Sequence, residues 1–289
     1  MAEAMAEDER LERARNRYID LLKRSLLGQT YFDNELRILY LRQCARGEAE
    51  YDEALLQDIR RHRPEQIPKV AATIEAGMPI GTDLQNLAFC YTMLGKKRLE
   101  NLELCVRAVI RESIPGDLIE CGLWRGGAAV FMRGMLAAFD VRDRVVWAAD
   151  SFQGLPTPEA APDVAFGLDL SREKFPMLAV DLDTVRRAFE AHGLLDDQVR
   201  FLPGWFKDTL PSAPIERLAL LRVDGDLYSS TREALDALYD RVVPGGFVIV
   251  DDYFLPNCRQ AVDDFIVERR MTEPIERIDW TGIYWRTPR

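Results

Sequence analysis

Two apolar runs in the second half of the chain each end in a pair of carboxylates. The run LALLRV (218–223) is followed at once by Asp224 and Asp226, and the run FVIV (247–250) by Asp251 and Asp252. The stretch between the two runs is long enough for one helix and a return strand. Neighbouring parallel strands lie about 4.8 Å apart, and ligands collect where such strands end. If the two runs form adjacent strands, Asp224, Asp251 and Asp252 converge on one spot.

Three converging carboxylates repel one another unless a cation joins them. Hard oxygen ligands favour Mg²⁺, Mn²⁺ or Ca²⁺, so we expect Asp224, Asp251 and Asp252 to be metal ligands. The chain has two histidines, which leaves proton and metal chemistry mainly to carboxylates. A second interpretation is that some of these acids cap helices, as Asp226 could do ahead of SSTREAL (229–235).

A glycine-containing turn predicts a nucleotide site nearer the middle of the chain. The stretch DLIECGLWRGGAAVF (117–131) reads as strand, turn and helix, and its three glycines do not form the G-x-G-x-x-G pattern of dinucleotide sites. The turn instead fits the looser acid-x-G-x-x-x-G arrangement of S-adenosylmethionine enzymes. Glu120 ends this strand, where it could meet the methionine ammonium. Asp150 ends the next strand, where a carboxylate can accept hydrogen bonds from both ribose hydroxyls.

The elements that must position these residues alternate along the second half of the chain. From Pro115 onward, apolar strand-like runs alternate with helical runs, which predicts βαβ units around a mostly parallel sheet. The segment IERIDWTGIYWR (275–286) predicts an antiparallel hairpin at the sheet edge. Residues 1–114 read as a helical N-terminal region and residues 115–289 as the catalytic domain. The long stretch after Asp150 predicts a flap over the site.

Composition narrows the class of protein. The chain has 289 residues, a formal net charge of −10 and 47% hydrophobic residues. The acidic balance argues against nucleic acid or an anionic membrane as partner. Its five cysteines form no CxxC pair, and no apolar run approaches the length of a membrane span. We therefore expect a reduced, cytoplasmic protein.

The sequence resembles the macrocin/mycinamicin-type sugar O-methyltransferases. The resemblance rests on long blocks in fixed order, which are YTMLGKKRLENLELCV, PGDLIECGLWRGGAAVFMRG, WAADSFQGLP, GLLDDQVRFLPGWFKDTLP, LRVDGDLYSST, GGFVIVDDY and DWTGIYWR. It implies an α/β fold of class I methyltransferase type: a mostly parallel, Rossmann-like seven-stranded sheet with a C-terminal antiparallel hairpin. This chain has Ser229 where DGDLYEST is commoner, a departure that leaves the acids intact.

The resemblance also assigns roles to residues. It implies S-adenosylmethionine as methyl donor, Mg²⁺ (or Mn²⁺) on Asp224, Asp251 and Asp252, and Asp226 as general base. The cofactor contacts that it implies are Thr92, Met93, Glu120, Gly122, Trp124, Asp150, Ser151, Phe152, Gly154, Asp181 and Trp205. For Asp181 a helix N-cap role is an equal alternative.

These features predict an enzyme that methylates a sugar hydroxyl of a glycosylated natural product, such as a macrolide or similar antibiotic. The acceptor is a small-molecule glycoside or polyol, and an aromatic diol or polyketide hydroxyl is the alternative. Two further rivals are an NAD-dependent oxidoreductase and a methyltransferase-like subunit without turnover. Because the helical N-terminal region carries apolar faces that the sheet cannot wholly bury, we also expect a homodimer or higher homo-oligomer.

Overall fold

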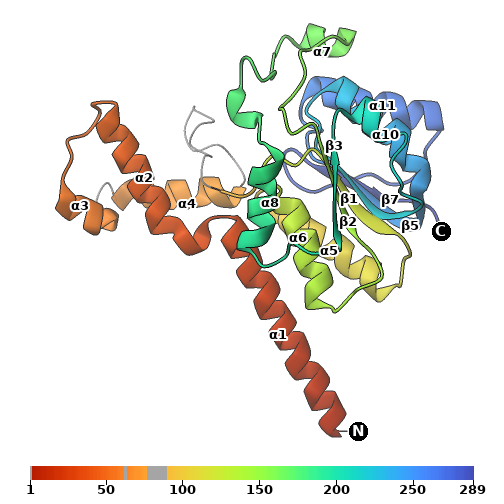
Figure 1. Ribbon diagram of the computed structural model, residues 1–289, viewed down its shortest axis with the longest axis horizontal. Helices are drawn as coiled ribbons and strands as arrows, with labels where there is room; N and C mark the ends of the chain where they lie inside the picture. Colours follow the sequence, from red (N-terminus) through yellow and green to blue (C-terminus); the bar gives the residue numbers. More distant parts are fainter. Residues whose placement is uncertain (1, 62–63, 77–89) are drawn as a thin grey trace. The chain divides into compact units, whose positions relative to one another are not determined.

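The computed structural model describes residues 2–61, 64–76 and 90–289, and the chain divides into two compact units, 1–96 and 97–289. The N-terminal unit is helical, as the sequence predicts (Figure 1). Its α-helices are α1 (Ala2–Leu26), α2 (Phe32–Ala45), α3 (Glu53–Gln57) and α4 (Ile67–Ala76). Short 3₁₀ turns lie at Gln29–Tyr31, Ile59–Arg61 and Pro64–Gln66.

A small apolar cluster organises the described part of this first unit. Leu36 and Tyr40 of α2 pack with Ile59, and the Tyr40 side chain is 1% exposed. The Tyr40 hydroxyl donates to the carbonyl of Glu50 and accepts the N–H of Asp52, at 2.8 and 2.7 Å. This aromatic side chain therefore closes the turn after α2 with its polar end while its ring fills the core.

The second unit is an α/β domain built on a seven-stranded sheet. Its strand order is β3-β2-β1-β4-β5-β7-β6. The strands are β1 (Asp117–Cys121), β2 (Val146–Asp150), β3 (Val199–Pro203), β4 (Leu218–Val223), β5 (Val242–Val250), β6 (Glu276–Arg277) and β7 (Ile283–Arg286). Strands β1 to β5 pair in parallel, whereas β7 pairs antiparallel with β5 and with β6. The predicted mostly parallel sheet and its C-terminal hairpin are both confirmed.

Helices cover both faces of this sheet (Figure 1). They are α5 (Lys96–Arg111), α6 (Gly127–Ala138), α7 (Ala161–Phe166), α8 (Leu182–Ala191), α9 (Phe206–Thr209), α10 (Tyr228–Leu238) and α11 (Pro256–Arg269), with 3₁₀ turns at Pro176–Leu178 and Tyr239–Arg241. Helices α6 and α8 lie on one side and α10 and α11 on the other. In the described ranges, no helix is long and apolar enough to cross a membrane.

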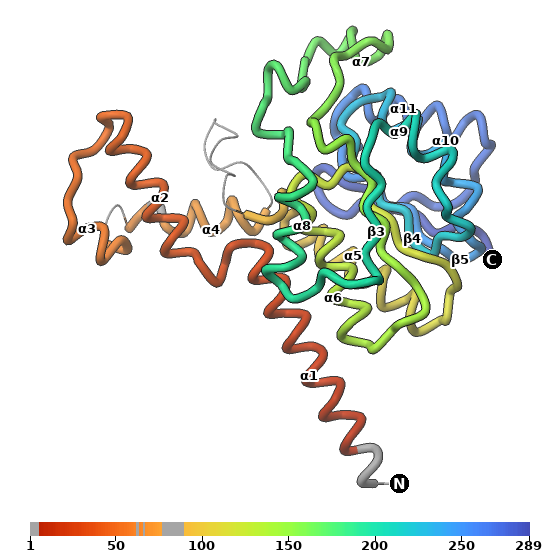
Figure 2. The backbone as a smooth tube through the Cα atoms, viewed as in Figure 1, coloured from red at the N-terminus to blue at the C-terminus, as the bar shows by residue number. Residues whose placement is uncertain are grey.

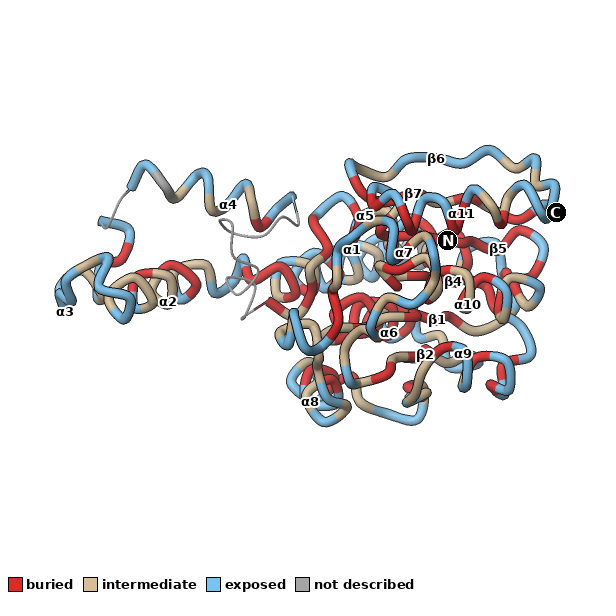
Figure 3. The backbone as a smooth tube through the Cα atoms, turned by 90° about the horizontal axis from the view of Figure 1, so that it is seen from above, coloured by how far each residue is buried: buried red, intermediate tan, exposed pale blue. Residues whose placement is uncertain are grey.

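The strand sequences follow from this two-sided cover. Strand β4 is buried at every position, and Figure 3 shows the central strands as largely buried. Leu221 and Val223 belong to the core cluster that also holds Leu235 of α10 and Val262 of α11. Because side chains alternate along a strand, Arg222 between them faces the opposite side of the sheet.

The sequence predicts a boundary between residues 114 and 115, after α5. The two units of the structure divide between residues 96 and 97, at the start of α5. Helix α5 begins at the boundary between the units, and all but its first residue belongs to the unit that holds the sheet. Its buried Leu99, Leu102 and Val106 recur at helical spacing. The catalytic unit therefore includes this helix.

Candidate functional site

The ends of β4 and β5 lie side by side, because the hydrogen-bond ladders continue one residue past the strands. Asp224 donates its N–H to the carbonyl of Cys121 at 2.8 Å, and Asp251 donates its N–H to Val223 at 3.0 Å. The first residue after β4 and the first after β5 are thereby fixed at the carboxyl edge of the sheet. This is the edge at which open α/β sheets bind ligands.

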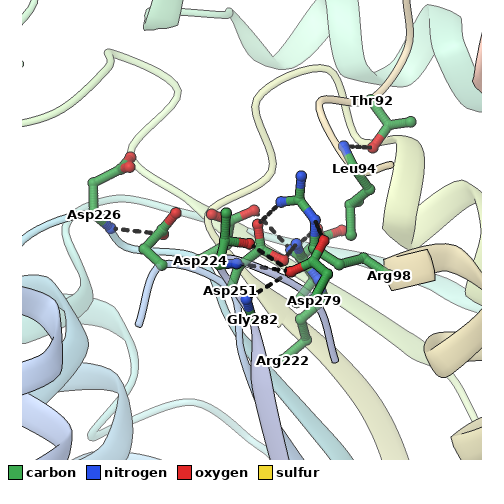
Figure 4. Close-up of polar contacts among 12 residues, drawn as sticks. Thr92, Leu94, Arg98, Arg222, Asp224, Asp226, Asp251, Asp279 and Gly282 are labelled. Carbon is green, nitrogen blue, oxygen red and sulfur yellow. Dashed lines mark hydrogen bonds and ion pairs between the residues drawn. The ribbon is translucent and has the colours of Figure 1, made fainter. Parts of the chain in front are cut away.

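Three carboxylates meet at this edge, as the sequence predicts. One oxygen from each of Asp224, Asp251 and Asp252 lies within 4.8 Å of the others. Asp226 lies beside them, and its backbone N–H donates to Oδ2 of Asp252 at 3.2 Å (Figure 4). Its backbone φ of 56° is in the left-handed region, which residues other than glycine adopt at a cost.

The electrostatics of the cluster favour a bound cation. Burial raises the pKa of Asp252 well above its usual value, and the charges of Asp226 and Asp224 raise it further. Burial and the charges of Asp224 and Asp251 raise the pKa of Asp226 to about 7. Since hard oxygen ligands and unbalanced negative charge suit Mg²⁺ or Mn²⁺, the donor set fits such an ion.

A buried arginine that the sequence reasoning missed lies behind the acids. The Arg222 guanidinium, 1% exposed, contacts Glu120 at 2.6 Å and Asp224 and Asp251 at 2.8 Å each. The parallel register sets Arg222 directly beside Glu120. One charged residue inside an otherwise apolar strand was the signal for a buried ion pair. Removing one partner of such a pair typically costs about 3–5 kcal/mol.

A second buried arginine approaches Asp251 from the start of α5. Arg98 contacts Oδ2 of Asp251 at 2.5 Å and Asp279 at 3.2 Å (Figure 4). Burial alone would raise the pKa of Asp251, but the charges of Arg98 and Arg222 outweigh it and hold that pKa below its usual value. Asp251 therefore stays ionised and is held in place by the two arginines.

Asp150, at the end of β2, is held in place by two backbone hydrogen bonds. One of its oxygens accepts the N–H of Leu123 and the other that of Phe152, each at 2.7 Å. Burial raises the pKa of Asp150, and these two hydrogen bonds oppose that rise. The Ser151 hydroxyl lies 3.5 Å from the oxygen that accepts from Phe152, and the other oxygen keeps a second lone pair for a hydroxyl donor.

Two glycines of the turn after β1 lie where packing within the protein leaves no room for a side chain. Gly122 has φ of 91°, and a Cβ there would lie 1.8 Å from the carbonyl oxygen of Asp224. Gly126, with φ of 81°, would bring a Cβ to 2.8 Å from a methyl of Val185. The first of these glycines is thus required by the close approach of the two strand ends that carry Glu120 and Asp224.

Glu120 is buried and is paired with Arg222. Its side chain is 2% exposed, and its ion pair with Arg222 crosses from β1 to β4. Burial raises the pKa of Glu120 to about 8, although the Arg222 charge opposes this. Direct contact with a cofactor ammonium stays a prediction.

The other residues of the second unit that the resemblance implies lie in the loops after β1, β2 and β3. Trp124 donates its ring N–H to the carbonyl of Met177 at 3.0 Å, and Ser151 donates its hydroxyl to the carbonyl of Gly154 at 2.7 Å. These bonds fix the loops after β1 and β2. Phe152, with φ of 55°, makes an edge contact with Phe201, and Trp205 lies immediately before α9; Thr92 and Met93 belong to the N-terminal unit. Their cofactor contacts stay predictions.

Asp181 takes the alternative role that the sequence left open. Its carboxylate accepts the N–H of Thr184 at 2.7 Å and so caps α8. This hydrogen bond lowers the pKa of the Asp181 carboxyl.

For Asp226 the structure disfavours the helix-cap interpretation. The first N–H groups of α10, those of Tyr228 and Ser229, donate to the carboxylate of Asp163 instead, at 2.6 and 3.2 Å. The turn residue before α10 is Leu227, which lies between Asp226 and the helix. The carboxylate of Asp226 is thus not needed to cap α10.

Comparisons with known proteins agree on one family. A family model described as macrocin-O-methyltransferase (TylF) matches residues 15–287. Mycinamicin III 3''-O-methyltransferase of Micromonospora griseorubida is 51% identical over 219 residues, which cover 75% of this chain and 85% of that protein. A 4'-O-methyltransferase of Streptomyces olivaceus, which acts on 8-demethyl-8-(2,3-dimethoxy-alpha-L-rhamnosyl)-tetracenomycin C, is 44% identical over 95% of this chain and 94% of its own length. The solved structure of the O-methyltransferase NovP superposes with a TM-score of 0.75 at 42% identity, covering 95% of this chain and all of that one.

Proposed function

Because the chain belongs to the macrocin-O-methyltransferase family, we propose that it transfers the methyl group of S-adenosylmethionine to a sugar hydroxyl of a glycosylated natural product. The observation that carries this proposal is the convergence of Asp224, Asp251 and Asp252 next to Asp226. An acid cluster of this kind suits the activation of a poorly acidic hydroxyl. The relatives act on mycinamicin III and on a rhamnosyl tetracenomycin, which supports a glycoside as acceptor.

The cofactor end of the site would be formed by the loops after β1 and β2. Asp150 would accept the ribose hydroxyls, with its carboxylate held in place by the N–H groups of Leu123 and Phe152. Bound S-adenosylmethionine would supply an electrophilic methyl group. The backbone at Gly122 and Trp124, held in place by the neighbouring strand and by Met177, would set the position of the donor.

The acceptor end would be formed by the strand-end acids. Asp224, Asp251 and Asp252 would hold Mg²⁺ or Mn²⁺, which lowers the pKa of a hydroxyl bound to it. Asp226 would then accept the hydroxyl proton. Asp226 lies next to these ligands, since its backbone N–H donates to Asp252, and a carboxylate in that place can act as a general base. Arg222 and Arg98 would keep the ligand carboxylates in position from behind.

An exposed aromatic pair at the same edge supports an acceptor with a large apolar part. Phe254 and Trp280 are 38% and 44% exposed, and their rings meet at a centroid distance of 4.8 Å. Phe254 lies in the turn closed by the hydrogen bond from Leu255 to Asp252. Trp280 follows Asp279, which is paired with Arg98. We propose that these two rings contact the aglycone, because aromatic surfaces bind apolar ligand groups.

Replacement of both rings should separate substrate binding from chemistry. In Phe254→Ala/Trp280→Ala, we expect KM for the rhamnosyl tetracenomycin acceptor to rise about tenfold or more, with kcat changed by less than about threefold, as for the loss of ground-state binding. Steady-state kinetics measures both values. The exposed Val267 (75% exposed) on α11 provides a control, Val267→Ala. An unchanged KM in the double variant would contradict the assignment of the aglycone contact.

Two measurements test the proposed function itself. Calorimetry should show binding of S-adenosylmethionine and none of NAD⁺, which separates the methyltransferase from an oxidoreductase on the same sheet plan. Incubation with S-adenosylmethionine, Mg²⁺ and mycinamicin III or the rhamnosyl tetracenomycin should then yield a product heavier by one CH₂. Methylation of a simple catechol instead would favour the aromatic-diol alternative. Cofactor binding without turnover of any acceptor would favour a non-catalytic subunit.

The N-terminal unit has a further proposed role. We propose that its helices contribute to a homo-oligomer, at least a dimer. The exposed apolar side chains of α1 and α2, among them Leu21 (58%) and Leu41 (41%), support this role. Light scattering that showed a monomer at micromolar concentration would contradict it.

A further inference from the structure

The connection between β2 and α8 contains a buried carboxylate that the mechanism above does not use. Asp163, in α7, is 1% exposed although Val164 beside it is 58% exposed. Its Oδ1 accepts the Tyr228 N–H at 2.6 Å and the Asn257 side-chain amide at 2.8 Å. Its Oδ2 accepts the N–H and the hydroxyl of Ser229 at 3.2 and 2.9 Å. One carboxylate of this connection is therefore bound to the first turns of both α10 and α11.

The same contacts reach the turn that carries Asp226. The side-chain amide of Asn257 donates to Asp163 and also to the backbone carbonyl of Asp226, at 3.1 Å. On the other side, the Asp226 N–H donates to Asp252. A non-glycine residue with φ of 56° keeps that conformation only when its surroundings hold it. The peptide groups on both sides of Asp226 are thus held, one through Asp163 and Asn257 and one through Asp252.

Asp163 is also the point at which the middle of the connection is attached to the helices. Within the connection, Leu155 forms a bridge with Ser171, and nearer to α8 the Met177 carbonyl accepts the ring N–H of Trp124. Between them, α7 packs against α10 and α11 (Figure 2). The Asp163 carboxylate also faces the positive N-terminal end of α10, which favours its negative charge.

From this geometry we propose that Asp163 is a positioning residue of the methyl transfer. It attaches the connection to the catalytic unit and, through Asn257 and the start of α10, holds the turn of Asp226 in its left-handed conformation. Seating of the connection and placement of the Asp226 carboxylate are therefore coupled. The proposal rests on the proposed function in one respect, the role of Asp226 as proton acceptor.

Hydrogen exchange tests the coupling without any acceptor. In Asp163→Asn, one oxygen that accepts hydrogen bonds becomes an amide that donates them, so at least one bond to a charged group is lost. We expect peptides covering 157–170 and 224–230 to exchange about tenfold faster, the factor that the loss of one such bond gives. Exchange in β1 and β2 should be unchanged. Asp169→Asn is the matched control, because Asp169 lies in the same connection and accepts the N–H of Ser171, a turn that asparagine supports equally.

Kinetics then distinguishes positioning from mere attachment. With S-adenosylmethionine and the rhamnosyl tetracenomycin as probes, Asp163→Asn should lower kcat by about 10- to 100-fold, as misplacement of a catalytic group does. Cofactor affinity, measured by calorimetry, should stay within about threefold, because the hydrogen bonds of Asp163 go to α10 and α11, whereas Asp150 is held by Leu123 and Phe152.

The milder variant Ser229→Ala provides the same test if Asp163→Asn does not fold. It removes a single hydroxyl donor to Asp163. We expect it to speed hydrogen exchange in both peptides and to lower kcat, each by a few fold. Faster exchange in 157–170 with a rigid 224–230 turn would overturn the coupling, as would faster exchange in both with an unchanged kcat. A normal kcat in Asp226→Asn, by contrast, would contradict the assigned base and leave the exchange result standing.

Discussion

Turnover should fall to background when divalent cations are removed with EDTA, and should return when Mg²⁺ or Mn²⁺ is added. A sugar hydroxyl is too weakly acidic for a carboxylate to deprotonate unaided, and a bound cation supplies the missing acidification. Asp224, Asp251 and Asp252 would provide the oxygen ligands, since one oxygen of each lies within 4.8 Å of the others. The measurement is methyl transfer by dialysed enzyme across a titration of added metal. Full turnover by metal-free enzyme would contradict the assignment of these acids.

The variant Asp252→Ala tests whether this one carboxylate is needed for metal binding and turnover. We expect it to bind S-adenosylmethionine normally while losing Mn²⁺ binding, measured by calorimetry, and turnover with it. Asp252 is buried and lies at the end of β5, away from the Asp150 loop at the end of β2. The exposed Asp197→Ala provides a control for the loss of one negative charge. If Asp252→Ala lost cofactor affinity instead, the end of β5 would belong to the donor.

Asp226→Asn should lower kcat by about 10²–10⁴, the usual contribution of a positioned proton acceptor. The amide matches the carboxylate in shape but cannot accept the proton. Because Asp163 accepts the first N–H groups of α10, the loss of charge at Asp226 should leave that helix intact. The contact from the Asp226 backbone N–H to Asp252 is also kept. Fold, cofactor binding and metal binding should therefore be unchanged.

Two controls accompany this prediction. Circular dichroism and calorimetry with S-adenosylmethionine and with Mn²⁺ should match the wild type, which excludes an indirect loss of the site. The variant Asp264→Asn removes a carboxylate that accepts the Tyr228 hydroxyl on the same helix pair and should leave kcat within about twofold. A kcat near the wild-type value for Asp226→Asn at saturating metal would assign the proton to another group or to water.

Much of the catalytic unit follows from local sequence pattern. Apolar runs bounded by glycine and separated by helical runs predict the parallel strands, and the two acid-ended runs are indeed adjacent in β4 and β5. Their adjacency could be predicted because the stretch between them allows one crossover, and such connections usually join neighbouring strands. The segment around Trp280 predicts the antiparallel hairpin for a similar reason, since two short runs joined by a tight turn pair with each other.

The partners of the acids could not be predicted in the same way. Arg222 meets Glu120 only because β1 and β4 pair in one register, in which these two residues are neighbours on the same face. A shift of one residue would send the side chains to opposite faces. Arg98 reaches Asp251 from a helix 153 positions away in the sequence. Sequence periodicity is local, and it carries no information on such pairs.

The sequence by itself thus determined the sheet plan, the carboxylates at its edge and, through its resemblance to a family, the class of reaction. Hydrophobic periodicity and strand-end chemistry are properties of short stretches, and they survive without knowledge of distant neighbours. Only the tertiary structure decided what holds those carboxylates in place. It set Arg222 and Arg98 behind the strand-end acids and Asp163 against the helix that follows the turn of Asp226. The physical reason is that a buried charge is stable only beside its partner, and strand register and loop path, which are non-local, decide which partner it meets.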